Sequence, residues 1–322
     1  MRNESFANIF DAAKSGSIEN VKFFVEELGA DVDVTDEHGN TPLDIAAKFN
    51  SELDVLEYIF SVSAVAKTGK YPVAQDVDGR AKAGCTCSLF RVIQDSSNVA
   101  LLKYLVAVGA DVNPRLVNKS GSQAVDGWTP LHFAVWKSNM EVLKCLISLG
   151  ADVHQKDENG RTPLIVAAQM GNIEVIQFLI SKGADIHTKN NEGRTSLHFA
   201  AANDNLEVVE FLVSLGADVH AKNVLGHAPL VSAICNSKNT AIVFFLISQG
   251  SDVSAKDTTD WTPLHQAAYS NDNVEVARFL VSKGADVHAK TQEGETPLDF
   301  AKTRENTAVA EYLETIIAEP QS

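Results

Sequence analysis

The sequence predicts an all-α fold, a solenoid of stacked helix–turn–helix units rather than one globular core. A Thr-Pro-Leu motif recurs every 33 or 34 residues, and a Gly-Ala-Asp-Val segment or a close variant follows about twenty residues later. A fixed period in this range indicates supersecondary units that each bury an apolar face against a neighbour. The motif starts are Thr129, Thr162, Thr195, Ala228, Thr262 and Thr296, with alanine in place of threonine once.

One repeat shows why its first helix forms. Gly193 precedes that helix in a tight turn that needs a positive φ. Thr195 can cap the helix, and sibling repeats place proline next, where its fixed φ suits the first helical position. Leu197, Ala200 and Ala201 give the helix a slim apolar face that lets a neighbour pack closely.

The second helix of the same repeat is longer and more apolar. Val208, Phe211, Leu212 and Leu215 recur at helical spacing. Gly216 then follows as the residue that ends a helix in a left-handed conformation. The repeat is therefore expected to be loop, helix, turn, helix.

We expect nine such units within a single array over 1–322, and the first and last have the polar character of capping repeats. Insertions near 63–84 and 114–125 interrupt the period in neighbouring loops. They either mark a binding face or represent tolerated loop length. The units begin near residues 6, 41, 87, 129, 162, 195, 228, 262 and 296.

The motif Thr129-Pro130-Leu131-His132, its copy at 262–265 and the Gly-Ala-Asp-Val segments resemble the ankyrin repeat family over nearly the whole chain. The resemblance implies a β-hairpin projecting from each first loop, and a concave binding face made of hairpins and first helices. It also implies that His132, His198 and His265 tie neighbouring repeats together by hydrogen bonds. Asn113 occupies a position that can be hydroxylated in the family.

Charge and composition exclude several classes of partner. The net charge of −15 argues against nucleic acid, because binding a duplex depends on cations placed on phosphates. Residues 1–60 and 128–322 each carry a net charge of −9, whereas 61–127 carry +3. The acidic parts either favour a partner with a basic patch or keep the protein in solution. No apolar run reaches the roughly 18 residues of a membrane helix, so we expect no membrane partner.

Candidate chemistry is sparse. The four cysteines show neither disulfide nor zinc spacing, which suits a reducing, cytoplasmic compartment. Lys67-Thr68-Gly69-Lys70 lacks the pattern of a phosphate-binding loop. Histidines recur near the repeat ends, but stacked repeats hold equivalent residues roughly 8–10 Å apart, too far to share one zinc ion. We therefore expect a monomeric non-enzyme with no catalytic, cofactor-binding or metal-binding residues. The recurring histidines are His154, His187, His220 and His288.

Large side chains at variable positions of the expected concave face are the candidate partner-binding residues, because interface hot spots favour Trp, Tyr and Arg. The position before Thr-Pro is tryptophan in two repeats and arginine in two others. For Trp128 and Trp136 the alternative is local packing under the 114–125 insertion. The candidates are Trp128, Trp136, Arg161, Met170, Arg194, Leu225, Trp261 and Tyr269.

The preferred function is a non-enzymatic protein–protein interaction module, a scaffold or adaptor. The alternatives are a dedicated inhibitor or immunity-type protein that blocks one enzyme, or a host-targeted ankyrin effector. An enzyme that uses groups on the two insertions is a third hypothesis, for which no nucleophile–base pair or metal constellation is visible.

Overall fold

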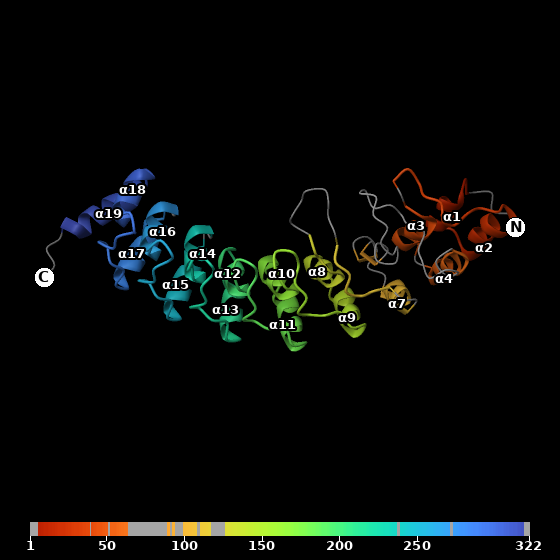
Figure 1. Ribbon diagram of the computed structural model, residues 1–322, viewed down its shortest axis with the longest axis horizontal. Coiled ribbons are helices and arrows are strands. Elements are labelled where there is room, and N and C mark those ends of the chain that lie inside the picture. The colour runs from red at the N-terminus through yellow and green to blue at the C-terminus, as the bar shows by residue number, and fades with distance from the viewer. Residues whose placement is uncertain are drawn as a thin grey trace. The chain divides into compact units, whose positions relative to one another are not determined.

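A computed structural model gives the fold of the 322-residue chain. Its contacts divide the chain into two compact units, Met1–Glu158 and Asn159–Ser322, called here the N-terminal and C-terminal units. The described residues form helices joined by turns, and contain no β-strand (Figure 1). The described residues are 6–38, 40–50, 52–63, 89–90, 92–93, 99–107, 110–116, 126–236, 239–270 and 273–318.

The N-terminal unit consists of packed helix pairs. α1 packs against α3, α2 against α4, and α7 against α9. The described helices are α1 (Ile9–Ser15), α2 (Ile18–Lys22) with the π-helical turn η1 (Phe23–Glu27), α3 (Pro42–Phe49), α4 (Leu53–Val62), α7 (Val99–Ala107), α8 (Pro130–Trp136) and α9 (Met140–Ser148).

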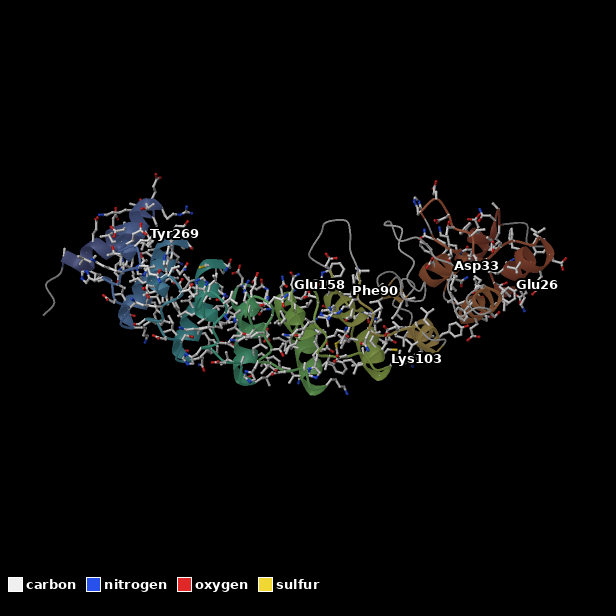
Figure 2. All side chains as sticks on the ribbon, in the orientation of Figure 1. Glu26, Asp33, Phe90, Lys103, Glu158 and Tyr269 are labelled. Atoms are coloured by element: carbon white, nitrogen blue, oxygen red, sulfur yellow. The ribbon has the colours of Figure 1, made fainter. Side chains whose placement is uncertain are left out.

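The C-terminal unit contains five consecutive helix pairs, which confirms the helix–turn–helix repeat. Each first helix packs against the next first helix, so that these helices form one row and the second helices another (Figure 1). Tyr269, in α16, lies on the row of first helices (Figure 2). The pairs are α10 (Pro163–Met170) with α11 (Ile173–Ser181), α12 (Ser196–Ala201) with α13 (Leu206–Ser214), α14 (Pro229–Asn236) with α15 (Thr240–Ser248), α16 (Pro263–Ser270) with α17 (Val274–Ser282), and α18 (Pro297–Thr303) with α19 (Thr307–Ala318).

Helix boundaries follow from local chemistry. Thr296 accepts the backbone N–H of Asp299 at 3.4 Å, and the Asp299 carboxylate accepts the N–H of Thr296 at 2.8 Å. Gly216 follows Leu215, the C-cap residue of α13, and has a φ of +91°, as expected. An asparagine side chain caps the start of five second helices; these residues are Asn139, Asn172, Asn205, Asn239 and Asn273.

Two of the motif histidines, His198 and His265, link consecutive repeats. The ring of His198 is fully buried; its Nδ1 accepts the N–H of Thr195 at 3.1 Å, and its Nε2 lies 3.0 Å from the carbonyl oxygen of His227 in the next repeat. His265 reaches the carbonyl oxygen of Glu295 in the same way, at 3.2 Å. Because Nδ1 accepts, Nε2 must carry the proton, so each ring is neutral. The hydrogen-bonding role expected of His198 and His265 is confirmed.

The first loops of the C-terminal unit are tight turns. The N–H of Asn223 donates to the carbonyl of His227 at 3.0 Å, and Asp257 donates to Trp261 at 3.0 Å. Neighbouring turns are also joined, for example by the N–H of Thr258 and the carbonyl of Leu225 at 3.0 Å. Because the described residues contain no strand, the expected projecting β-hairpins are not confirmed.

Most of both expected insertions lies outside the described residues, which include only Ser63 of the first and 114–116 of the second. At the base of the second, Leu116 donates its N–H to the carbonyl of Trp128 and accepts the N–H of Gly127, both at 2.8 Å. The prediction of one continuous array stays a prediction. Within the described part of the chain, no helix combines the length and apolar character needed to cross a membrane.

Two glycines with positive φ allow a controlled test of how closely consecutive turns approach. Gly160 and Gly216 have φ of +74° and +91°. A Cβ on Gly160 would lie 2.6 Å from the backbone nitrogen of Asn191, whereas one on Gly216 would meet nothing within 4 Å. We expect Gly160→Ala to lower the free energy of unfolding by about 1 kcal/mol more than Gly216→Ala, since both incur the left-handed strain and one adds a clash. Urea unfolding followed by circular dichroism measures the difference; equal losses would contradict the close approach.

Candidate functional site

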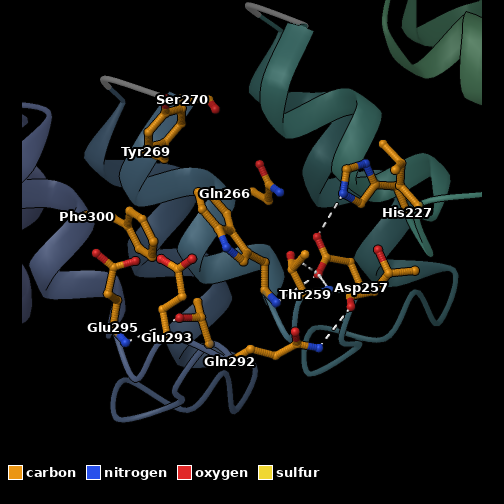
Figure 3. Close-up of a pocket in the computed structure, with 14 residues that line it drawn as sticks. His227, Asp257, Thr259, Gln266, Tyr269, Ser270, Gln292, Glu293, Glu295 and Phe300 are labelled. Carbon is orange, nitrogen blue, oxygen red and sulfur yellow. Dashed lines mark hydrogen bonds and ion pairs between the residues drawn. The ribbon is translucent and has the colours of Figure 1, made fainter.

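A groove in the C-terminal unit has a volume of about 590 Å³ and is lined by residues from three consecutive repeats. The turn before α14 contributes Leu225 and His227, and the turn before α16 contributes Asp257 and Trp261. Helices α16 and α18 and the turn before α18 supply the remaining wall (Figure 3). The groove therefore lies between the turns and the first helices, on the side where the sequence predicts a binding face.

Three aromatic rings form one wall of this groove. The ring of Trp261 lies 4.2 Å from that of Phe300 and 5.4 Å from that of Tyr269, centre to centre. Phe300 is buried, Trp261 is partly buried, and Tyr269 is 39 % exposed. The Arg304 guanidinium lies 4.5 Å above the Tyr269 ring. These contacts hold the rings in place, so the wall is preformed.

The hydrogen-bonded pair His227 and Asp257 lines the opposite side of the groove. Asp257 Oδ2 lies 3.0 Å from His227 Nε2 (Figure 3). The other carboxylate oxygen of Asp257 accepts the N–H groups of Thr259 and Trp261 at 2.8 and 2.9 Å. Burial raises the pKa of Asp257, but these hydrogen bonds outweigh burial and hold the pKa below its ordinary value. Asp257 is therefore an anion that fixes both the turn and the backbone of Trp261.

The structure brings three of the eight sequence-predicted residues to this groove: Leu225, Trp261 and Tyr269. Arg194 lines an adjoining groove of about 370 Å³, which Leu225 also borders. The Arg194 guanidinium lies 4.5 Å above the ring of Phe199. Met170 is exposed and Arg161 is partly buried, and neither lines these two grooves; both lie in the C-terminal unit.

The N-terminal unit holds the other two predicted tryptophans. Trp136 is 45 % exposed, whereas Trp128 is only 4 % exposed. The ring of Trp128 packs against those of Phe133 and Trp136, at 5.0 and 6.2 Å. The expectation that Trp128 contacts a partner directly is therefore corrected, because its side chain belongs to the local core. Trp136 stays a candidate.

Sequence reasoning missed Phe300 and the rim residues Glu293 and Glu295. The positions one before, four after and seven after the capping threonine can converge within one repeat, but this pattern does not record which residue of the next repeat enters the groove. Trp128, Phe133 and Trp136 occupy these positions within one repeat. In the repeat that begins at Thr262, the residue equivalent to Phe133 is Gln266, which is not aromatic. The ring of Phe300, from the next repeat, contacts Trp261 and Tyr269 instead.

The remaining residues that the sequence singled out have structural environments. The Asn113 side chain donates to the carbonyl of Gly150 at 3.1 Å and accepts the N–H of Asp152 at 2.8 Å, so it joins two repeats. Burial raises the pKa of the Cys145 and Cys235 thiols. The recurring histidines at positions 154, 187, 220 and 288 are exposed. No group of three or more potential metal ligands gathers among the residues that the structure describes.

Comparison with known proteins agrees with this architecture. A family model described as ankyrin repeats in three copies matches residues 89–190, 139–223 and 230–319. A second model, described as ankyrin repeats in many copies, matches residues 9–60. No curated protein matches the chain significantly. Because the matched residues make up most of the sequence and the helix pairs repeat as expected, the chain belongs to the ankyrin repeat family.

Proposed function

We propose that the groove lined by Leu225, Trp261 and Tyr269 binds a segment of a partner protein. Ankyrin repeats are in general protein–protein interaction modules and are typically non-enzymatic. The observation that carries the proposal is the convergence of these three side chains, which come from separate elements and border one groove. The proposal includes a scaffold or adaptor role for a monomeric chain.

The solvent exposure of these side chains and the packing that holds their rings support the proposal. Leu225 is 52 % exposed although it is apolar, and Tyr269 presents part of its ring to solvent. Rings that neighbouring contacts already hold lose little conformational entropy when a partner covers them. The groove volume of about 590 Å³ lies within the range of ligand-sized clefts, which suits an extended segment better than the face of a folded domain.

The double variant Leu225→Ala/Tyr269→Ala tests this proposal. We expect it to weaken partner binding at least about tenfold, because two exposed side chains with large apolar surface are removed from the lining of the groove. The intact chain is used first as bait, and captured proteins are identified and quantified by mass spectrometry. Affinity for the purified partner is then measured by isothermal titration calorimetry.

The matched control is Leu215→Ala. Leu215 is an exposed leucine at the end of α13 and does not line the groove. Its truncation should leave partner affinity within about twofold of wild type, since surface substitutions away from an interface have small effects. If the double variant bound the partner as tightly as this control does, the groove would not be the binding site.

A further inference from the structure

The charge of the groove points to the chemistry of its occupant. Its described lining contains three carboxylates, one imidazole and no lysine or arginine. One of the carboxylates, that of Asp257, is already engaged by His227 and by the turn that it organises. The other two belong to Glu293 and Glu295, in the turn before α18.

These two glutamates are available to a ligand. Glu293 is exposed and Glu295 is partly buried. Neither side chain forms an ion pair within the described part of the chain, whereas other acids on these turns do, as Asp260 does with Lys256 at 3.8 Å. Figure 3 shows both carboxylates on the Phe300 side of the groove, next to the aromatic wall. An apolar or acidic occupant would remove water from them without replacing its hydrogen bonds, whereas a cationic donor replaces those bonds and also balances the charge.

We propose that the groove selects an extended, arginine-bearing segment, with a guanidinium group between the aromatic wall and Glu293 and Glu295. This inference rests on the proposed protein-binding function and specifies the partner's chemistry. Arginine fits better than lysine because its planar group stacks on aromatic rings and donates in parallel to carboxylates. The chain itself contains such stacking, with the guanidinium of Arg304 on Tyr269 and that of Arg194 on Phe199, both at 4.5 Å.

The turn before α14 adds a second requirement. Val224 and Leu225 are both more than half exposed, and Leu225 borders the groove. An apolar side chain of the partner that covered Leu225 would gain burial beside the charged contact. The expected ligand therefore combines an arginine with a nearby apolar residue in one extended segment.

A peptide display library of random 12-residue sequences, selected on the intact chain, provides the test. We expect enrichment of peptides that contain arginine near an apolar residue. The best peptide is then synthesised with arginine and with citrulline, which keeps the shape and removes the charge. Replacing arginine by citrulline, or the protein's glutamates by Glu293→Gln/Glu295→Gln, should each weaken binding about tenfold, since a pair of rim charges is lost.

The control variant Glu207→Gln/Glu210→Gln removes the same charge from exposed positions on α13, outside the groove. It should bind the peptide as wild type does. Groove-dependent peptides without a basic residue, bound equally by the Glu293→Gln/Glu295→Gln variant, would overturn the arginine proposal and leave the groove function intact. If every selected peptide also bound Leu225→Ala/Tyr269→Ala unchanged, both proposals would be wrong.

Discussion

Lowering the pH from 7 to 5 is expected to destabilise the C-terminal unit by about 2 kcal/mol through His198. Burial of the ring is the main cause that lowers the pKa of His198 from 6.5 to about 4. The hydrogen bond to the carbonyl of His227 acts in the opposite direction but is the smaller effect. In the unfolded chain the imidazole has its ordinary pKa. Between about pH 6.5 and pH 4 the unfolded chain therefore binds more protons, and stability falls as the pH falls through that window.

The geometry explains why the protonated ring is disfavoured. In the neutral form Nδ1 accepts the N–H of Thr195 and Nε2 donates to His227. A proton added to Nδ1 would turn this acceptor into a donor that faces another donor, inside a site with no access to water. The pKa of His265 is lowered as well, again mainly by burial, so its effect has the same sign.

The measurement is urea unfolding at pH 7 and pH 5, with wild type and His198→Gln compared. The variant should be less stable at pH 7 but should lose less stability on acidification, because it lacks the group that binds the extra proton. The lowered pKa values of Asp257 and Asp299 have most of their effect below about pH 4, outside this window. Identical pH dependence in the two proteins would show that His198 keeps an ordinary pKa.

Most of the fold could be predicted from the sequence because its determinants are local. A capping threonine, a following proline and a terminal glycine act within a few residues, and each recurs at a fixed spacing. The inter-repeat bond of His198 was expected from the resemblance to the ankyrin repeat family. It joins side chain to backbone, so it does not depend on the neighbour's side chain. The insertions near 63–84 and 114–125 interrupt the period, and most of both lies outside the described residues.

The candidate site was predictable only in part because it depends on which side chains adjacent repeats place together. Trp128 and Trp261 hold equivalent positions, yet the first is buried by aromatic residues of its own repeat. Trp261 packs instead on Phe300 from the next repeat and still borders the groove. A sequence motif that covers a single repeat contains no information about the contact between Trp261 and Phe300. For the same reason Glu293, in the turn of the following repeat, was not recognised as part of the candidate site.

Truncation of Leu212 to alanine is expected to cost about 3 kcal/mol, the largest effect of any single substitution considered for this chain. Leu212 is fully buried in α13, whereas Leu215, one helical turn later, is 41 % exposed. The same change at Leu215 should cost less than about 0.5 kcal/mol, since little surface is removed from contact. The pair therefore compares a buried leucine in the last turn of α13 with an exposed leucine at its C-cap, both changed to alanine.

The position of the lost contacts also predicts where the damage spreads. α13 packs against α12 of its own repeat and α15 of the next. In a stacked array each repeat is stabilised by its neighbours, so amide hydrogen exchange should accelerate most in α12, α13 and α15 and least in α19. Urea unfolding gives the total loss, and exchange followed by mass spectrometry gives its distribution. Equal losses for Leu212→Ala and Leu215→Ala would contradict the buried position of Leu212, and uniform acceleration would show that the unit unfolds as one cooperative body rather than repeat by repeat.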